Sequence, residues 1–323
     1  MAEIRVLVLP EEVEAGTAQT PRGDFAVIHA APASVESPRG FGVLVHGWTG
    51  SKEDFAAVLP LLARNGWAAV AYDQRGASET AGYPTSDDYT WDHLGADAAA
   101  VAAWFVQQQS AQPGSVQPGF VPPGSVHLVG HSFGGLVAAN AVAADPERWA
   151  TVTFLCSGPA GKDDPPSLVG LTRLATELAG LAVAYPPGPA RALSMGAIWD
   201  AMRQEGADPV GAPDIEAWLH DRFTRHDPAG LSRFSRMLAD APDRIDDVAR
   251  AEVPGFVVYG ESDDAWPLAL QDAMAARLGS TPVVIAGVGH SPAVDQPETL
   301  ADVLTGLWAG QHEDDGTDDE PAA

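Results

Sequence analysis

The chain has 323 residues, 46% of them apolar, and a formal net charge of −26. No apolar run approaches the roughly 18 to 20 residues that a membrane-spanning helix needs, so the composition predicts a globular protein and excludes an integral membrane protein. An acidic excess of this size repels nucleic acid and anionic lipid. We therefore expect a small-molecule substrate, with no nucleic-acid partner and no membrane partner.

The two ends of the chain and its single cysteine indicate the compartment. Six acids fall at 313–315 and 318–320, so we interpret 312–323 as a disordered acidic tail. The N-terminus is acidic and its apolar stretch is too short for a signal peptide. Cys156 cannot form an internal disulfide and lies in an apolar run, where a buried strand residue is expected. These features predict a cytoplasmic protein.

Apolar strand-like runs alternate with helical patterns over most of the chain, which is typical of a mostly parallel sheet covered by helices. The expected strands are 4–9, 25–29, 42–46, 68–73, 126–129, 149–156, 255–259 and 283–285. The expected helices between them are 53–65, 93–109, 133–144, 268–278 and 298–308. The proline-rich stretch 110–125 is interpreted as an extended surface insertion.

Between 158 and 241 the pattern changes to helices without an intervening strand. These helices are expected at 168–184, 190–204, 215–224 and 231–238. We therefore predict an α/β fold with an eight-stranded, mostly parallel sheet over 1–157 and 242–311, into which a helical cap over 158–241 is inserted.

One short motif places a serine where a strand meets a helix. The strand expected at 126–129 leads into Gly130-His131-Ser132-Phe133-Gly134, and a helix is expected directly afterwards. Small residues allow the sharp turn that leaves a serine hydroxyl exposed at the start of a helix. The motif therefore predicts Ser132 as a nucleophile.

A serine hydroxyl needs a base and a carboxylate that orients the base. On this kind of sheet both follow the serine in the chain. Of the histidines after the late strands, His312 falls in the acidic tail, so His290, in the glycine-rich stretch 287–290, is the predicted base. Glu261, Asp263 and Asp264 follow the strand at 255–259, and spacing alone does not separate them.

Acyl transfer also requires two backbone N–H groups that stabilise the oxyanion. One is predicted at Phe133, the residue after the nucleophile. The other is predicted at Trp48, in the sequence His46-Gly47-Trp48-Thr49-Gly50 that follows an earlier strand. A site of this kind needs no metal and no organic cofactor, and we expect neither.

These motifs together resemble the α/β-hydrolase superfamily, in particular its cap-bearing serine hydrolases, which include esterases, haloperoxidase-like enzymes and proline iminopeptidases. The resemblance covers nearly the whole chain except 110–125 and the tail. It rests on HGWTG at 46–50, DQRGASET at 73–80, GHSFGG at 130–135, GESDDAWP at 260–267 and GVGHS at 287–291. The family pattern G-x-x-D-x-x-x-P implies that the triad acid is Asp263.

The resemblance also narrows the expected chemistry. Epoxide hydrolases of this branch use an aspartate nucleophile, which Ser132 excludes, and Trp48-Thr49 replaces the glycine-proline of the iminopeptidase oxyanion loop. We expect hydrolysis of a small to medium, largely apolar carboxylic ester. The alternatives are a C–C hydrolase or lyase with the same triad and, less favoured, a peptidase or a non-catalytic binder. Cap side chains expected to line the pocket include Tyr185, Trp199 and Trp218.

Overall fold

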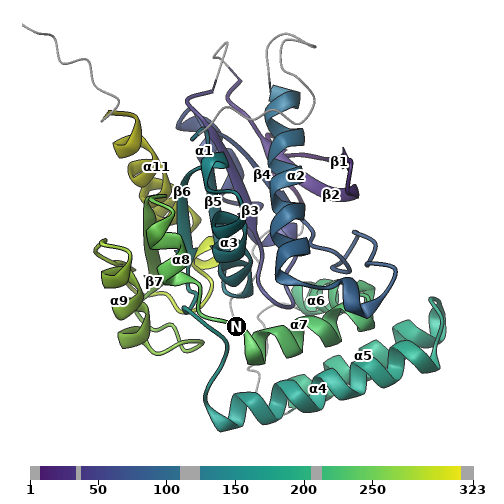
Figure 1. Ribbon diagram of the computed structural model, residues 1–323. Helices are drawn as coiled ribbons and strands as arrows, with labels where there is room; N and C mark the ends of the chain where they lie inside the picture. Colours follow the sequence, from purple (N-terminus) through teal and green to yellow (C-terminus); the bar gives the residue numbers. More distant parts are fainter. Residues whose placement is uncertain (1–7, 34–37, 110–123, 205–212, 314–323) are drawn as a thin grey trace, which may run out of the picture.

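The computed structural model describes residues 8–33, 38–109, 124–204 and 213–313, whose strands form one eight-stranded sheet (Figure 1). The strands are β1 Glu14–Thr20, β2 Gly23–Ala30, β3 Phe41–Val45, β4 Ala68–Tyr72, β5 Val126–His131, β6 Trp149–Leu155, β7 Gly255–Gly260 and β8 Val283–Ile285. They lie in the order β1-β2-β4-β3-β5-β6-β7-β8. The pairs β1–β2 and β2–β4 are antiparallel, and the pairs from β4 to β8 are parallel.

The first strand differs from the prediction. Residues 4–7 of the strand expected at 4–9 lie outside the described residues, and Val8 and Leu9 are not in a strand. The first strand is instead β1, whose residues pair in register with β2 from Glu14 with His29 to Thr20 with Gly23. Only Ala18 of β1 is buried, so this edge strand has no apolar pattern by which sequence could identify it.

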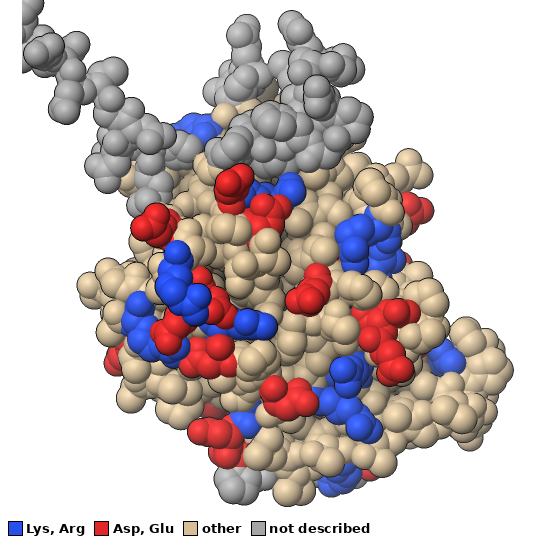
Figure 2. Space-filling model, viewed as in Figure 1, with Lys and Arg blue, Asp and Glu red and all other residues tan. Residues whose placement is uncertain are grey.

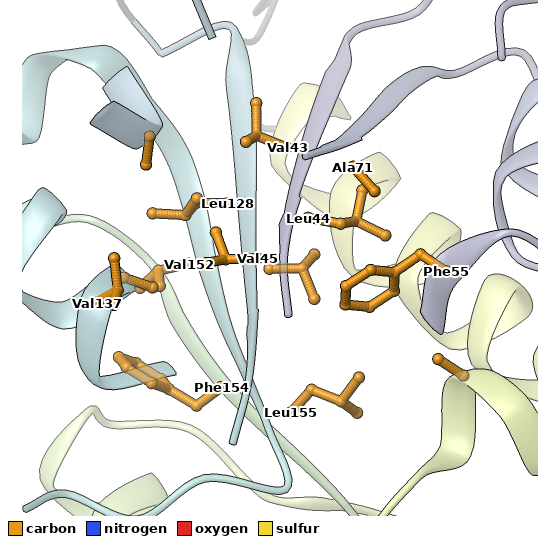
Figure 3. Close-up of a cluster of buried hydrophobic side chains, with 14 of the residues drawn as sticks. Val43, Leu44, Val45, Phe55, Ala71, Leu128, Val137, Val152, Phe154 and Leu155 are labelled. Atoms are coloured by element: carbon orange, nitrogen blue, oxygen red, sulfur yellow. The ribbon is translucent and has the colours of Figure 1, made fainter. Parts of the chain in front are cut away.

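The central strands are apolar on both faces because helices cover both sides of a parallel sheet. Every residue of β4 is buried, and the first five residues of β5 are buried too. Side chains from neighbouring strands and from the flanking helices meet in a single core, part of which is drawn in Figure 3. This core holds the carboxyl ends of β5, β6 and β7 side by side.

The helices pack in two groups on the sheet. They are α1 Leu59–Arg64, α2 Trp91–Gln109, α3 Phe133–Ala144, α8 Ile245–Arg250, α9 Leu268–Arg277, α10 Pro292–Asp295 and α11 Pro297–Glu313, with short 3-10 turns η1 Lys52–Phe55, η2 Ser86–Asp88 and η3 Pro146–Arg148. α2, α3 and α8 lie together in front of the sheet in Figure 1. α11 buries Trp308 against the backbone of Gly42 in β3.

Four helices form a separate layer beyond the carboxyl ends of the parallel strands, at the bottom of Figure 1. They are α4 Pro165–Ala184, α5 Pro189–Gln204, α6 Pro213–Arg225 and α7 Pro228–Asp240. Their buried apolar side chains make a second, smaller cluster: Leu174, Leu178, Leu181, Met195, Trp199, Leu219, Phe223 and Leu231. Residues 166–184 of α4 are long and apolar enough to cross a membrane by composition, yet the helix packs along α7.

The acidic excess does not form a continuous patch on the face drawn in Figure 2. Acidic and basic side chains alternate there. Charged side chains of the described residues also pair with one another, such as Arg277 with Asp243 and Asp246. Exposed pairs of this kind contribute at most about 1 kcal/mol each.

Candidate active site

Ser132 lies between β5 and α3 in a backbone conformation that side-chain-bearing residues rarely adopt. Its φ is 54° and its ψ is −120°. Such a conformation costs about 1 to 3 kcal/mol and persists only where its surroundings enforce it. Here the Ser132 N–H donates to Leu155 O at 2.9 Å, and the Ser132 carbonyl accepts from Ser157 Oγ at 2.8 Å and from the Gly135 N–H at 2.9 Å.

Three glycines around Ser132 allow this sharp turn, because a Cβ on any of them would meet other atoms. A Cβ at Gly130 would lie 2.3 Å from the Gly134 carbonyl oxygen, and one at Gly134 would lie 2.3 Å from the Val45 carbonyl oxygen. At Gly135 the obstacle is Ser157 Oγ, also at 2.3 Å. The glycines of the motif are therefore required by the close approach of backbones, as the sequence predicted.

The structure places His290 and Asp263 in direct contact. His290 Nδ1 lies 2.8 Å from Asp263 Oδ1. Since a carboxylate can only accept, Nδ1 carries the proton and the lone pair is on Nε2. An imidazole held in this tautomer can take a proton from a nearby hydroxyl.

The three acids after β7 have different surroundings. The Asp263 side chain is fully buried, whereas Glu261 and Asp264 are exposed. Burial acts to raise the pKa of Asp263, but hydrogen bonds from His290, the Ala265 N–H and Gln271 Nε2 keep that pKa below its ordinary value. Asp263 is therefore a buried carboxylate, charged at neutral pH.

Glu261 has a different contact in the same loop. Its carboxylate accepts a hydrogen bond from the Gly287 N–H at 2.9 Å, at the start of the stretch that carries His290. The geometry thus distinguishes the three acids that spacing left open: Asp263 orients the imidazole, Glu261 braces the histidine loop, and Asp264 faces solvent.

His131, which the sequence analysis did not select, also acts on His290. Its Nε2 lies 2.7 Å from the His290 carbonyl oxygen, and the two rings have centroids 4.9 Å apart. Burial lowers the pKa of His131 to about 4, so the ring is neutral at pH 7 and donates from Nε2. The residue before Ser132 therefore holds the backbone of the residue that carries the base.

The two residues predicted to supply the oxyanion N–H groups are close to Ser132 in the structure. Phe133 is the first residue of α3, so its N–H has no acceptor within the helix. A Cβ on Gly47 would lie 3.3 Å from Ser132 Cβ, so the backbone that leads into Trp48 reaches the nucleophile directly. The arrangement can place two N–H groups near an oxygen bound at Ser132.

His46 holds the backbone of the 46–50 loop in place through hydrogen bonds. Its Nδ1 donates to the Gly47 carbonyl at 2.7 Å and its Nε2 accepts from the Gln74 N–H at 3.1 Å, while Gln74 Nε2 donates to the His46 carbonyl at 2.9 Å. Burial lowers the pKa of His46 to about 4, in agreement with the neutral ring that these contacts require. Hydrogen bonds therefore connect the HGWTG motif to the DQRG motif.

Two cavities have Ser132 and His290 in their walls. The main cavity has a volume of about 460 Å³ and extends under α4, α5 and α7. Its apolar wall consists of Trp48, Leu171, Leu174, Ile198, Met202, Leu238 and Trp266. The smaller cavity, of about 210 Å³, lies on the other side of Trp48. An apolar group of moderate size fits the main cavity beside the serine.

One of the three predicted pocket side chains lines a cavity at the site, and the other two do not. Trp199 lines the smaller cavity, whereas Tyr185 and Trp218 line neither cavity. Tyr185 follows the last turn of α4, where its side chain is 41% exposed. Trp218 lies beneath the guanidinium of Arg222 on α6. These two expectations were wrong because the sequence of a helix does not determine which of its faces is turned toward the serine.

Among the described residues, one group of metal-type donors lies at the site. Atoms of Cys156, Asp263 and His290 lie within 4.8 Å of one another. Two of these atoms already bind each other through the His290–Asp263 hydrogen bond. The hydrogen bond that orients the imidazole therefore explains why these atoms lie close together.

Comparison with known proteins agrees with this geometry. The model of the alpha/beta hydrolase family matches residues 43–303. A non-heme haloperoxidase of Rhodococcus erythropolis is 26% identical over 80% of this chain and 89% of its own length. A thermophilic esterase from Thermogutta terrifontis has the same fold at a TM-score of 0.67 and 20% identity, covering 93% of this chain and 99% of its own.

An enol-lactonase from Burkholderia xenovorans is also similar in fold, with a TM-score of 0.64, 17% identity, and coverage of 91% of this chain and 100% of its own. The family match spans most of the chain and includes every motif on which the resemblance was based. The chain belongs to the alpha/beta hydrolase family.

Proposed function

We propose that the protein is a serine hydrolase that cleaves a small to medium, largely apolar carboxylic ester through an acyl-enzyme. The observation that carries this proposal is the site of Ser132. The serine occupies a strained turn in the wall of an apolar cavity, and the same wall contains an imidazole that is oriented by a buried carboxylate. Family membership and fold support the reaction class.

In the first half-reaction, Nε2 of His290 takes the proton of the Ser132 hydroxyl as Oγ attacks the ester carbonyl carbon. The negative charge that develops on the carbonyl oxygen is stabilised by the N–H groups of Trp48 and Phe133. Asp263 stabilises the imidazolium, which then protonates the departing alcohol. The C–O bond breaks and the acyl group stays on Ser132.

In the second half-reaction, a water molecule attacks the acyl carbon while His290 Nε2 accepts its proton. The bond from the acyl carbon to Ser132 Oγ then breaks, Nε2 returns the proton to Oγ, and the carboxylic acid is released. We propose that residues 158–241 are a cap that shields these steps, because α4, α5 and α7 supply much of the apolar wall of the main cavity. Exclusion of bulk water strengthens the interactions with the oxyanion.

The proposal is tested with a fluorophosphonate probe and a p-nitrophenyl ester series of increasing acyl length. Wild type and Ser194→Ala, a serine of α5 that lines neither cavity, should be labelled and should turn over esters of short and medium length. Ser132→Ala should lose the label and retain only a residual rate, at least about 10³-fold lower. Ester hydrolysis by Ser132→Ala at the wild-type rate would contradict the proposal.

The competing activities give different outcomes. A triad-bearing C–C hydrolase or lyase would be labelled at Ser132 but would not turn over the esters. A peptidase would release the amine from aminoacyl amides as well as cleave the esters, whereas an esterase would leave the amides intact. A non-catalytic binder would show neither labelling nor turnover.

A further inference from the structure

Lys162 is a cation in the main cavity that forms no salt bridge among the described residues, although four carboxylates lie near enough to attract its charge. The chain has two lysines, and their surroundings differ. Lys52 Nζ lies within 2.9 Å of three carboxylates: Glu53, Asp73 and Glu79. Lys162 Nζ instead lies 3.6 Å from the centroid of the Trp266 ring. That cation–π contact leaves the N–H donors of Lys162 available to a ligand.

The backbone that carries Lys162 is tied to the end of α7. The Gly161 N–H donates to the Ala241 carbonyl, and the Lys162 N–H donates to the Leu238 carbonyl, both at 3.0 Å. A Cβ at Gly161 would lie 2.8 Å from the Ala239 carbonyl oxygen, so only glycine allows this approach. The side chain of Lys162 therefore starts from a fixed position at the cavity wall.

Trp266 links this ammonium to the catalytic machinery. Its ring is 2% exposed and lies against Gly158, where a Cβ would be 2.2 Å from Trp266 Cδ1. His290 is also close to Trp266: the centroids of the two rings are 6.4 Å apart. One aromatic ring therefore contacts Lys162 and neighbours the base, and all three side chains line the main cavity.

The carboxylates near Lys162 do not neutralise it. Asp164 caps α4 by accepting from the Ser167 N–H at 2.9 Å, and Asp263 accepts from His290. Asp163 and Asp264 are exposed and attract Lys162 only through space. Burial lowers the pKa of Lys162 to about 8 although these acids attract its charge, so the ammonium is largely protonated at pH 7.

Cations outnumber carboxylates in the wall of the main cavity, whereas acidic residues outnumber basic residues in the whole chain. The chain has 44 acids and 18 lysines and arginines. Apart from His290, the ionisable side chains of the main cavity are Lys162, Arg173 and Glu177, two cations and one carboxylate. A partly desolvated ammonium in a largely apolar cavity has a strong preference for an anion that restores its lost hydration.

We propose that Lys162 binds a carboxylate carried by the substrate, so that the preferred substrates are esters whose apolar chain ends in an acid group. This inference rests on the proposed ester hydrolysis at Ser132. The ester carbonyl lies at Ser132, the apolar spacer contacts the wall near Trp266, and the terminal carboxylate accepts hydrogen bonds from Lys162 Nζ.

Two matched pairs of esters test the inference. Methyl hexanoate and monomethyl adipate differ only in a carboxylate at the end of the acyl chain. 4-Acetoxybenzamide and 4-acetoxybenzoate differ only in a carboxylate on the alcohol side. For each pair, kcat and KM are measured by acid release at pH 7 for wild type, Lys162→Met, Lys162→Gln and Lys162→Arg. Arg236→Met, on the exposed face of α7, removes the same unit of charge outside the cavity.

For each pair, the measure of preference is kcat/KM for the anionic ester divided by kcat/KM for its neutral partner. In one of the pairs, Lys162→Met should lower this ratio about 10- to 100-fold, mainly by raising KM for the anionic ester. This range is the one expected for loss of a charge-assisted hydrogen bond. Lys162→Arg should keep most of the preference, and Arg236→Met should keep all of it. Lys162→Gln replaces Lys162→Met if thermal melting shows that the latter does not fold.

An unchanged ratio in both pairs, with the neutral esters still hydrolysed at Ser132, would overturn the role of Lys162 and leave the proposed function standing. If no ester is hydrolysed, the proposed function fails, and calorimetric titration with monomethyl adipate decides the question of the subsite. Binding by wild type that is lost in Lys162→Met would support a carboxylate subsite, and equal binding or none would overturn it.

Discussion

His131 Nε2 donates a hydrogen bond to the backbone carbonyl of His290 at 2.7 Å, so the residue that precedes the proposed nucleophile positions the residue that is the proposed base. The strand-to-helix turn and the late histidine loop are separated by 158 residues of chain, yet this contact makes them one unit. This contact therefore helps to fix the position of His290 relative to Ser132.

This relationship predicts the effect of His131→Phe. The ring can still pack, but the hydrogen bond to the His290 backbone is lost and the imidazole is less well aligned with Ser132 Oγ. A small misplacement of a catalytic group costs up to about 10²-fold in rate, so we expect kcat to fall about 10- to 100-fold with a smaller change in KM. Steady-state kinetics measures both.

The matched variant is His131→Gln, whose amide can donate to the same carbonyl. It should recover part of the lost kcat, whereas a purely steric role for His131 would make the phenylalanine variant the better of the two.

The orienting carboxylate gives a second prediction. Asp263→Asn removes the acceptor that fixes the tautomer of His290, and the kcat for ester hydrolysis should fall by about 10⁴-fold. Asp264→Asn is the matched control one residue away, and its exposed side chain predicts a rate within about twofold of wild type. Comparable losses in the two variants would contradict the assignment of Asp263.

The close approach of backbones at the nucleophile turn gives a third prediction. In Gly134→Ala the new methyl group would meet the Val45 carbonyl oxygen at 2.3 Å, and backbone cannot move away as a side chain can. The free energy of unfolding should fall by about 3 kcal/mol. Gly306→Ala in α11, where the methyl group meets nothing within 4 Å, should instead raise it by about 0.5 to 1 kcal/mol. Urea unfolding of both variants distinguishes them.

Buried neutral histidines predict sensitivity to acid. Burial lowers the pKa values of His46, His131 and His226 to about 4. The unfolded chain binds protons near the ordinary histidine pKa of about 6.5, whereas the folded chain does not until about pH 4, so stability is full above pH 6.5 and falls between those values. As the pH falls to about 4, each of the three rings lowers the free energy of unfolding by up to about 3 kcal/mol. Burial raises the pKa of Asp73 to about 6, so protonation of Asp73 acts in the opposite direction and stabilises the folded chain as the pH falls.

The urea midpoint should therefore decrease between pH 6.5 and 4.5. His226→Phe should make this decrease less steep, because one of the three proton-binding differences is removed. A midpoint that stays constant over that range in wild type would show that these rings do not control acid stability.

Sequence predicted best what depends on local pattern. The central strands and α3 are recognisable because continuous burial requires continuous apolar runs, and Ser132 because its turn requires glycines at fixed positions. The edge strand β1 could not be found in the same way. Its sequence is polar and it forms a strand because β2 offers unpaired backbone groups to it.

The contacts missed by sequence reasoning come from tertiary packing. Gln271 donates to Asp263, and His131 donates to the His290 backbone, but nothing in either residue's local sequence specifies these partners. Tyr185 was expected in the pocket because it is aromatic and lies in the helical insertion. The direction in which its side chain points depends on how α4 docks on α7, which helical periodicity does not determine.

Trp48 carries the predicted oxyanion N–H, and its side chain packs against both apolar clusters, while its indole Nε1 donates to Ser235 Oγ of α7 at 3.1 Å. Among the partly buried side chains of the described residues, it is the one shared by the two clusters. A displacement of α7 would therefore act on the side chain of the residue whose N–H is the proposed oxyanion donor. The helix that borders the main cavity and that donor are thus joined by a single hydrogen bond.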